Sequence, residues 1–249
     1  MRVRELWRYP VKSMGGEQLD ELTVGPRGAV GDRAYGVADV ASGTVLSAKR
    51  EGRLLHAHAR LVSSEPVVTV NGREYDPGPA LDESLSTWLG RDSRLVEASL
   101  VGRATFQAQS SFEDDDSPLQ SWEGAEGAFF DSSPLHLMTT GDVELLARQR
   151  PDVSWDVRRF RPNVVIEADL ESRRAWAKGQ RLRLGGVEIE VLKACERCVM
   201  TTRAQGDQLA RELDVLRHVA AHHDSVVGVL ARVVGAGVVR RHDPVTLAS

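Results

Sequence analysis

The two cysteines of the chain lie three residues apart, in the segment Ala194-Cys195-Glu196-Arg197-Cys198. A positive charge beside a thiol stabilises its thiolate form, so Arg197 favours an ionised cysteine here. A thiolate is a soft ligand and suits a soft metal centre. With only two cysteines, the chain can form neither a disulfide scaffold nor a four-cysteine zinc or iron–sulfur site.

Three other uses of these cysteines remain open. They can be buried as small apolar side chains with no chemical role. They can cycle between dithiol and disulfide, in which case both would matter equally. A zinc site would need two further ligands, for which His222 and His223 are candidates, although adjacent side chains of a helix point apart.

An arginine-rich segment suits an anionic ligand. Arg158, Arg159 and Arg161 come directly before Asn163, at the start of a predicted strand. Guanidinium groups match the oxygens of a phosphate, and an asparagine amide both donates and accepts hydrogen bonds. A solvated loop with ion pairs is the alternative interpretation.

Two shorter motifs precede or follow predicted strands near the N-terminus. Lys12 and Ser13 end the segment Tyr-Pro-Val-Lys-Ser, and Arg33 belongs to Gly-Asp-Arg. Each motif is weak alone, because a surface Asp-Arg pair usually contributes little.

Short strands dominate the elements that would position these residues. Alternating apolar residues and turn signals predict strands near residues 3–8, 35–39, 44–48, 67–70, 73–75, 135–138, 163–166, 181–193 (a hairpin), 226–234 and 238–241. Helices are predicted at 82–89, at 141–149 with Thr140 as N-cap, and at 207–221. The pattern indicates an α+β, β-rich, barrel-like fold with a few short helices.

Composition excludes several classes of protein. The 249 residues are 41% hydrophobic and 27% charged, and the net charge of −4 argues against nucleic-acid binding. The chain has no apolar run long enough to span a membrane and no signal-like N-terminus, so we expect a cytoplasmic protein. Residues 110–127 are acidic and poor in apolar side chains, which predicts a mobile loop at a domain border.

The motifs Tyr-Pro-Val-Lys-Ser, Gly-Asp-Arg, Arg-Phe-Arg-Pro-Asn and Cys-x-Arg-Cys-x-x-Thr-Thr occur in that order. In combination they resemble the MOSC proteins with an N-terminal β-barrel domain, including the amidoxime-reducing components. The resemblance runs from Arg4 to about Pro244. It implies an N-terminal MOSC β-barrel domain at residues 1–112, an acidic linker at 113–127 and a MOSC domain at 128–249.

The resemblance also implies a cofactor and its ligands. Proteins of that family carry the molybdenum cofactor, a pterin-dithiolene, and one cysteine completes the coordination of the metal. Here Cys198 matches that ligand, Arg197 falls beside the metal, and both would be catalytic residues. Glu196 departs from the family, whose members often have a small hydroxyl residue there, so the substrate preference is open. The positions that would hold the pterin or its phosphate are Lys12, Ser13, Arg33, Ser132, Ser133, Arg161, Asn163 and Arg197.

The implied activity is the reduction of small N-hydroxylated compounds. The chain has neither an iron–sulfur cysteine cluster nor a Gly-x-Gly-x-x-Gly fingerprint, so a separate redox protein would supply electrons. We expect a monomer that binds no nucleic acid and no membrane. The alternatives are a non-catalytic carrier of molybdenum cofactor or sulfur, and a Cys-x-x-Cys thiol redox protein.

Overall fold

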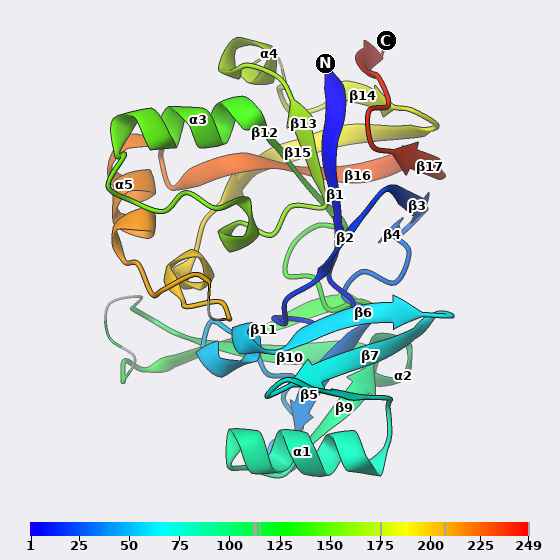
Figure 1. Ribbon diagram of the computed structural model, residues 1–249, viewed down its shortest axis with the longest axis vertical. Coiled ribbons are helices and arrows are strands. Elements are labelled where there is room, and N and C mark those ends of the chain that lie inside the picture. Colours follow the sequence, from blue (N-terminus) through cyan, green and yellow to red (C-terminus); the bar gives the residue numbers. More distant parts are fainter. Residues whose placement is uncertain (112–113, 115, 175, 207, 249) are drawn as a thin grey trace.

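The computed structural model describes residues 1–111, 114, 116–174, 176–206 and 208–248. Figure 1 shows a large sheet with helices beside it in the upper part, and smaller sheets with helix α1 (Pro79–Leu89) in the lower part. The fold is α+β and rich in strands, as the sequence predicts. Glu113 and Asp115, in the predicted acidic linker, lie outside the described residues.

Some strands of the large sheet bury one face, whereas every residue of the central strand β12 is buried. In β15, for example, Val187, Ile189 and Val191 are buried and alternate with charged residues, which confirms the predicted hairpin with β14. Neighbouring strands are antiparallel, except that β12 and β13 run parallel. In order across the sheet, the strands are β18 (Val245–Ala248), β14 (Arg181–Leu184), β15 (Val187–Glu196), β16 (Val226–Gly235), β12 (Leu135–Thr139), β13 (Val164–Glu167), β1 (Arg2–Arg8) and β2 (Glu17–Leu19).

The first strands of the chain pack with the last ones. β1 lies between β13 and β2, and β3 (Glu21–Gly25) pairs with both β17 (Gly237–Arg240) and β4 (Gly28–Ala29). Val3, Leu6 and Leu22 are therefore buried in the same core as the C-terminal strands. The N-terminal segment completes the upper part of Figure 1, whereas the division at residues 112 and 128 remains a prediction from the sequence.

The lower part contains short antiparallel ladders and two helices. Asn71 and Gly72 have φ angles of 50° and 78°, which confirms the predicted tight hairpin turn. Gly90 ends helix α1 in the left-handed conformation, also as predicted. The elements are β5 (Tyr35–Asp39) with β9 (Ser93–Glu97), β6 (His58–Val62) with β7 (Glu65–Val70) and β8 (Arg73–Tyr75), β10 (Arg103–Gln109) with β11 (Leu119–Glu126), and helix α2 (Ala98–Val101).

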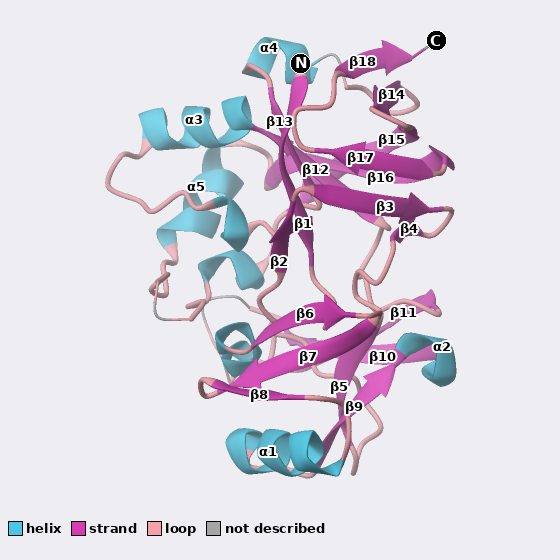
Figure 2. Cartoon of the chain, turned by 45° about the vertical axis from the view of Figure 1, so that its right-hand side comes forward, coloured by secondary structure: helices cyan, strands magenta, loops and turns pink. Residues whose placement is uncertain are grey.

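Helices cover one side of the large sheet, as Figure 2 shows. Leu146, Val215 and Val219 from two of them share a core with Met138 and Phe160. Among the described residues, no helix is both long and apolar enough to cross a membrane. The helices are α3 (Thr140–Gln149), α4 (Leu170–Arg174) and α5 (Asp214–His222), and the 3-10 turns are η1 (Gly52–His56), η2 (Val157–Arg159) and η3 (Val199–Thr202).

Residues 119–126 differ from the expected linker, because they form strand β11 against β10. The strand is not apparent from the sequence because it contains many polar residues. It is stabilised by the packing of Trp122 on Phe106, with a ring-centroid distance of 5.8 Å. Residues 44–48 were expected to form a strand, but Val45 makes an isolated bridge to Ala38 there.

Two helix starts also differ from the expectation. Helix α5 begins at Asp214 because residues 208–213 form a loop, and Arg159 Nη2 donates to the Ala210 carbonyl of this loop at 2.9 Å. Asp207, the first residue of the predicted helix, lies outside the described residues. The N-cap of α3 is Thr139 instead of Thr140. Its hydroxyl accepts from the Asp142 amide while the Asp142 carboxylate accepts from the Thr139 amide, which is a capping box.

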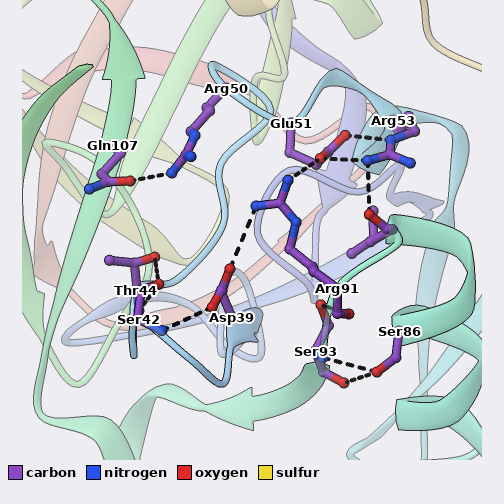
Figure 3. Close-up of polar contacts among 11 residues, drawn as sticks. Asp39, Ser42, Thr44, Arg50, Glu51, Arg53, Ser86, Arg91, Ser93 and Gln107 are labelled. Carbon is purple, nitrogen blue, oxygen red and sulfur yellow. Dashed lines mark hydrogen bonds and ion pairs between the residues drawn. The ribbon is translucent and has the colours of Figure 1, made fainter. Parts of the chain in front are cut away.

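The loop that carries Lys49 is tied down by its neighbours (Figure 3). Arg50 donates a short hydrogen bond to Gln107 on β10. Glu51 is buried and pairs with Arg91 at 3.4 Å. These contacts hold the two residues that directly follow Lys49 in the chain.

Candidate functional site

The site residues that the family resemblance proposes all line one cavity of about 380 Å³. The residues come from five separate segments of the chain, so the fold brings together residues that are far apart in the sequence. Those predicted residues are Lys12, Ser13, Arg33, Ser132, Ser133, Arg161, Asn163, Arg197 and Cys198. Arg158, from the arginine-rich segment, lies outside this lining and pairs with Asp156 at 2.7 Å.

Cys198 lies just beyond the end of β15. The pairing of β15 with β16 shifts register three times, the last time between Ala194 and Glu196, and such irregularities often re-aim side chains next to sites. Cys198 is half-buried at the cavity wall, whereas Cys195 is buried. The two thiols therefore have different environments.

Arg197 contacts Cys195 directly. Its Nη1 donates to the Cys195 sulfur at 3.0 Å, and its Nη2 donates to the Phe160 carbonyl at 2.9 Å. Burial raises the pKa of the Cys195 thiol, and the charge of Arg197 only partly opposes this. The expectation that Arg197 favours a thiolate is therefore outweighed by burial at Cys195.

His136 is a neighbour of Arg197 that the sequence did not indicate. Its Nε2 lies 3.3 Å from Arg197 Nη1. Burial, and next the charge of Arg197, hold the pKa of His136 well below its usual value. His136 is therefore a neutral ring that can accept a hydrogen bond from the guanidinium.

Two lysines share one carboxylate at the cavity wall. Asp131 accepts from Lys12 Nζ at 2.6 Å and from Lys49 Nζ at 2.8 Å, and Lys12 also donates to the Phe129 carbonyl. Burial alone would raise the pKa of Asp131, but the two ammonium groups outweigh it and hold that pKa below its usual range. Burial lowers the pKa of Lys12, against the pull of Asp131.

Arg33 and Arg161 stack on one buried aromatic ring. Their guanidinium carbons lie 4.9 and 4.1 Å from the ring centroid of Tyr9. Arg161 Nη1 donates to the Met14 carbonyl at 2.6 Å. Burial, followed by repulsion from Arg33, lowers the pKa of Arg161 to about 10.

Three residues of the cavity wall adopt left-handed backbone conformations. The φ angles of Ser13, Arg33 and Arg161 are 67°, 50° and 56°. This region is unfavourable for residues other than glycine, and such strain is often concentrated at functional sites. The energetic cost of these backbone conformations is consistent with a cavity wall whose side chains must point in fixed directions.

Some of the predicted site residues make hydrogen bonds to the backbone of the protein itself. Asn163 Oδ1 accepts from the His136 amide at 3.2 Å, and Ser13 Oγ accepts from the Ala48 amide at 2.9 Å. Ser133 Oγ donates to the Ala231 carbonyl at 2.7 Å. These contacts fix the side chains, while Ser132 is exposed at the rim.

The cavity is positively charged although the whole chain is negative. Of the described residues that line it, seven are lysine or arginine and two, Asp131 and Glu196, are acidic. Such a concave basic site attracts an anion. The basic residues are Lys12, Arg33, Lys49, Arg159, Arg161, Lys193 and Arg197.

The histidines considered for zinc lie elsewhere. His222 and His223 pack beside His218, at ring-centroid distances of 4.7 and 5.6 Å. Over the described ranges, no three His, Cys, Asp or Glu side chains form a group that could hold a metal ion.

Lys49, Asp131, His136 and Trp122 also line the cavity and were missed by the sequence analysis. Asp131 directly precedes Ser132, which is the one signal that could have suggested it. Lys49 and His136 lie in no motif, and only the fold brings them to the site.

Comparisons with known proteins agree on one family. Residues 125–246 match the sequence model of the MOSC domain, and residues 1–115 match that of the MOSC N-terminal beta barrel domain. The chain is 28% identical over 237 residues to mitochondrial amidoxime reducing component 2 of Rattus norvegicus, covering 80% of this chain and 66% of that protein. It is 26% identical over 235 residues to mitochondrial amidoxime-reducing component 1 of Homo sapiens, covering 80% of this chain and 65% of that protein.

A solved structure, the YUAD protein from Bacillus subtilis, aligns with a TM-score of 0.48 at 10% identity, covering 98% of this chain and 93% of that one. The chain therefore spans about two thirds of the length of the amidoxime-reducing relatives and nearly all of this bacterial structure.

Proposed function

The chain belongs to the family of MOSC proteins with a MOSC N-terminal beta barrel domain, and on this premise we propose that it is a molybdenum-cofactor oxidoreductase that reduces N-hydroxylated compounds. The observation that carries the proposal is a basic cavity whose lining includes all nine site residues implied by the resemblance, among them the half-buried Cys198. The relatives named above are amidoxime-reducing proteins, which supports the reaction type.

The residues of the cavity fit a pterin cofactor that carries a phosphate. Buried Arg161 Nη2 and Arg197 Nε have no hydrogen-bond partner among the described residues, so each leaves a donor for a ligand. Lys12, Ser13 and Arg33 would hold the phosphate or pterin, together with Ser132, Ser133, Arg161 and Asn163. Cys198 would bind the molybdenum through its thiolate, with Arg197 beside it.

When bound, the cofactor would supply two-electron chemistry at molybdenum. Reduction of an N–OH group consumes two electrons and two protons, breaks the N–O bond, and releases the parent N–H compound and water. The task of the protein is to orient the cofactor and substrate and to keep positive charge around the anionic group. Glu196, at the cavity wall, would influence which substrates are accepted.

The electron donor would be a separate redox protein, since the relatives this chain matches are named as components. The prediction remains a cytoplasmic monomer. Its division into residues 1–112, 113–127 and 128–249 also remains a prediction.

Turnover of an amidoxime with an artificial electron donor tests this function, using protein expressed in a host that makes the molybdenum cofactor. We expect reduction by the wild type, a loss of at least 100-fold in Cys198→Ser, and a far milder change in Cys195→Ser. Bound molybdenum without turnover would favour the carrier alternative. Equal loss in both cysteine variants would favour thiol redox chemistry.

A further inference from the structure

A second cavity, of about 320 Å³, adjoins the first at Cys198. The two cavities share the side chains of Lys49, Trp122, Arg197 and Cys198. Cys198 therefore lines both the basic cavity and this second space.

Five of the described residues line the second cavity alone: three are apolar, and the other two, Gln109 and Ser110, are polar but uncharged. Ala108 comes from β10, Val199 from η3 and Leu216 from α5. The basic cavity gathers seven cations, whereas the second cavity holds Lys49 and Arg197, both at the shared boundary. The space thus suits the apolar body of a small molecule whose polar end points to Cys198.

Trp122 is the largest side chain of this boundary, and its ring is held in place. It packs on Phe106 at 5.8 Å with an interplanar angle of 53°, and Lys49 Nζ lies 4.2 Å from its ring centroid. Lys49 is in turn fixed by Asp131 at 2.8 Å. A ring restrained in this way offers a ready surface for another aromatic ring.

We propose that the second cavity is the subsite for the body of the substrate, with Trp122 as a specificity-determining residue. The preferred substrates are then N-hydroxylated compounds with a flat aromatic body, stacked on Trp122 while the N–OH group lies at Cys198. The inference rests on the proposed function and specifies its substrate class.

Binding of two matched probes tests the subsite. Benzamidoxime and acetamidoxime carry the same N–OH group and differ in the body, so the ratio of their dissociation constants reports the subsite. We expect the wild type to bind benzamidoxime about tenfold more tightly, because aromatic stacking adds to the burial of the ring. Calorimetry on the holoprotein without an electron donor measures this ratio independently of turnover.

Variants separate the subsite from the fold. Trp122→Ala removes the ring and Ala108→Leu fills the space, so each should abolish the preference. Trp122→Phe keeps an aromatic face and should retain it. Trp88→Ala is the matched control, because Trp88 is a half-buried tryptophan on α1, outside both cavities. If Trp122→Ala does not fold, Ala108→Leu still decides the question.

The outcomes distinguish the inference from the function on which it rests. An equal affinity for both probes in the wild type, or a preference unchanged in Trp122→Ala and Ala108→Leu, would overturn the subsite even if acetamidoxime is reduced. A preference that depends on Trp122, in a protein that reduces neither probe, would support the subsite and contradict the proposed reductase activity.

Discussion

Replacing Asp131 by Asn tests how the basic cavity is kept stable. The carboxylate of Asp131 lies 2.6 Å from Lys12 Nζ and 2.8 Å from Lys49 Nζ, and these lysine side chains are only 6% and 15% exposed. Without the carboxylate, two nearly buried ammonium groups face each other with no compensating charge. The pKa of Lys12, already lowered by burial, should fall further, because Asp131 no longer opposes that effect.

The expected cost follows from burial. Removing one partner of a fully buried ion pair costs about 3–5 kcal/mol. The Asp131 side chain is 33% exposed, so solvent screens part of the interaction. We therefore expect Asp131→Asn to lower the free energy of unfolding by about 2–3 kcal/mol at neutral pH.

The pH dependence has a defined sign. The folded-state pKa of Asp131 lies below its usual range, so its stabilising effect is fully present above the unfolded-state pKa of about 3.9. It is lost as the pH falls through the folded-state value. The difference in stability between wild type and Asp131→Asn should be constant between about pH 5 and 7 and should shrink below about pH 4.

Urea unfolding of both proteins, followed by circular dichroism across this pH range, measures the effect. Asp152→Asn is the matched control, because Asp152 forms an ion pair with Arg150 on the exposed surface. A loss in Asp131→Asn no larger than that of the control, or a difference that grows as the pH falls, would refute this account of the cavity wall.

Two further substitutions test local features of the fold. Thr139→Ala removes the side chain of the capping box of α3, and we expect a loss of about 1 kcal/mol in urea unfolding; unchanged stability would show that the cap contributes nothing. Gly228→Ala places a Cβ 2.6 Å from His136 Nε2 and from the Leu137 carbonyl oxygen, at a φ of 77°. Since backbone and ring must both move, we expect a loss of about 1–3 kcal/mol, and a variant as stable as the wild type would contradict that close approach.

Strands with one buried face could be predicted from the sequence. Leu182, Leu184, Val187 and Ile189 alternate because one face of the large sheet is buried, and the hairpin follows directly. Strand β11 could not be predicted, because most of its side chains are polar and its place depends on a tertiary contact of Trp122.

The start of the helix predicted from residue 207 could not be predicted correctly for a different reason. Its apolar spacing is helical, but residues 208–213 form a loop instead, and the Gln205 amide donates to the Leu209 carbonyl at 2.8 Å. Arg159 then donates to the next residue, Ala210, from another part of the chain. Tertiary hydrogen bonds here override a local preference.

The same distinction holds for the site. Lys12, Arg33, Arg161 and Cys198 belong to motifs that resemble a family, so they could be named before the fold was known. Their neighbours, including Lys49, are placed by loops and strand ends that carry no motif. The charge balance of the cavity and the second space beside Cys198 therefore emerge only from the three-dimensional structure.

The most direct test of the central claim is metal and pterin analysis of the wild type beside Cys198→Ser, both expressed in a host that makes the molybdenum cofactor. The account predicts near-stoichiometric molybdenum and pterin in the wild type, and loss of the metal or of its protein thiolate ligand in the variant, as seen by X-ray absorption at the molybdenum edge. Zinc, or no metal in either protein, would contradict it.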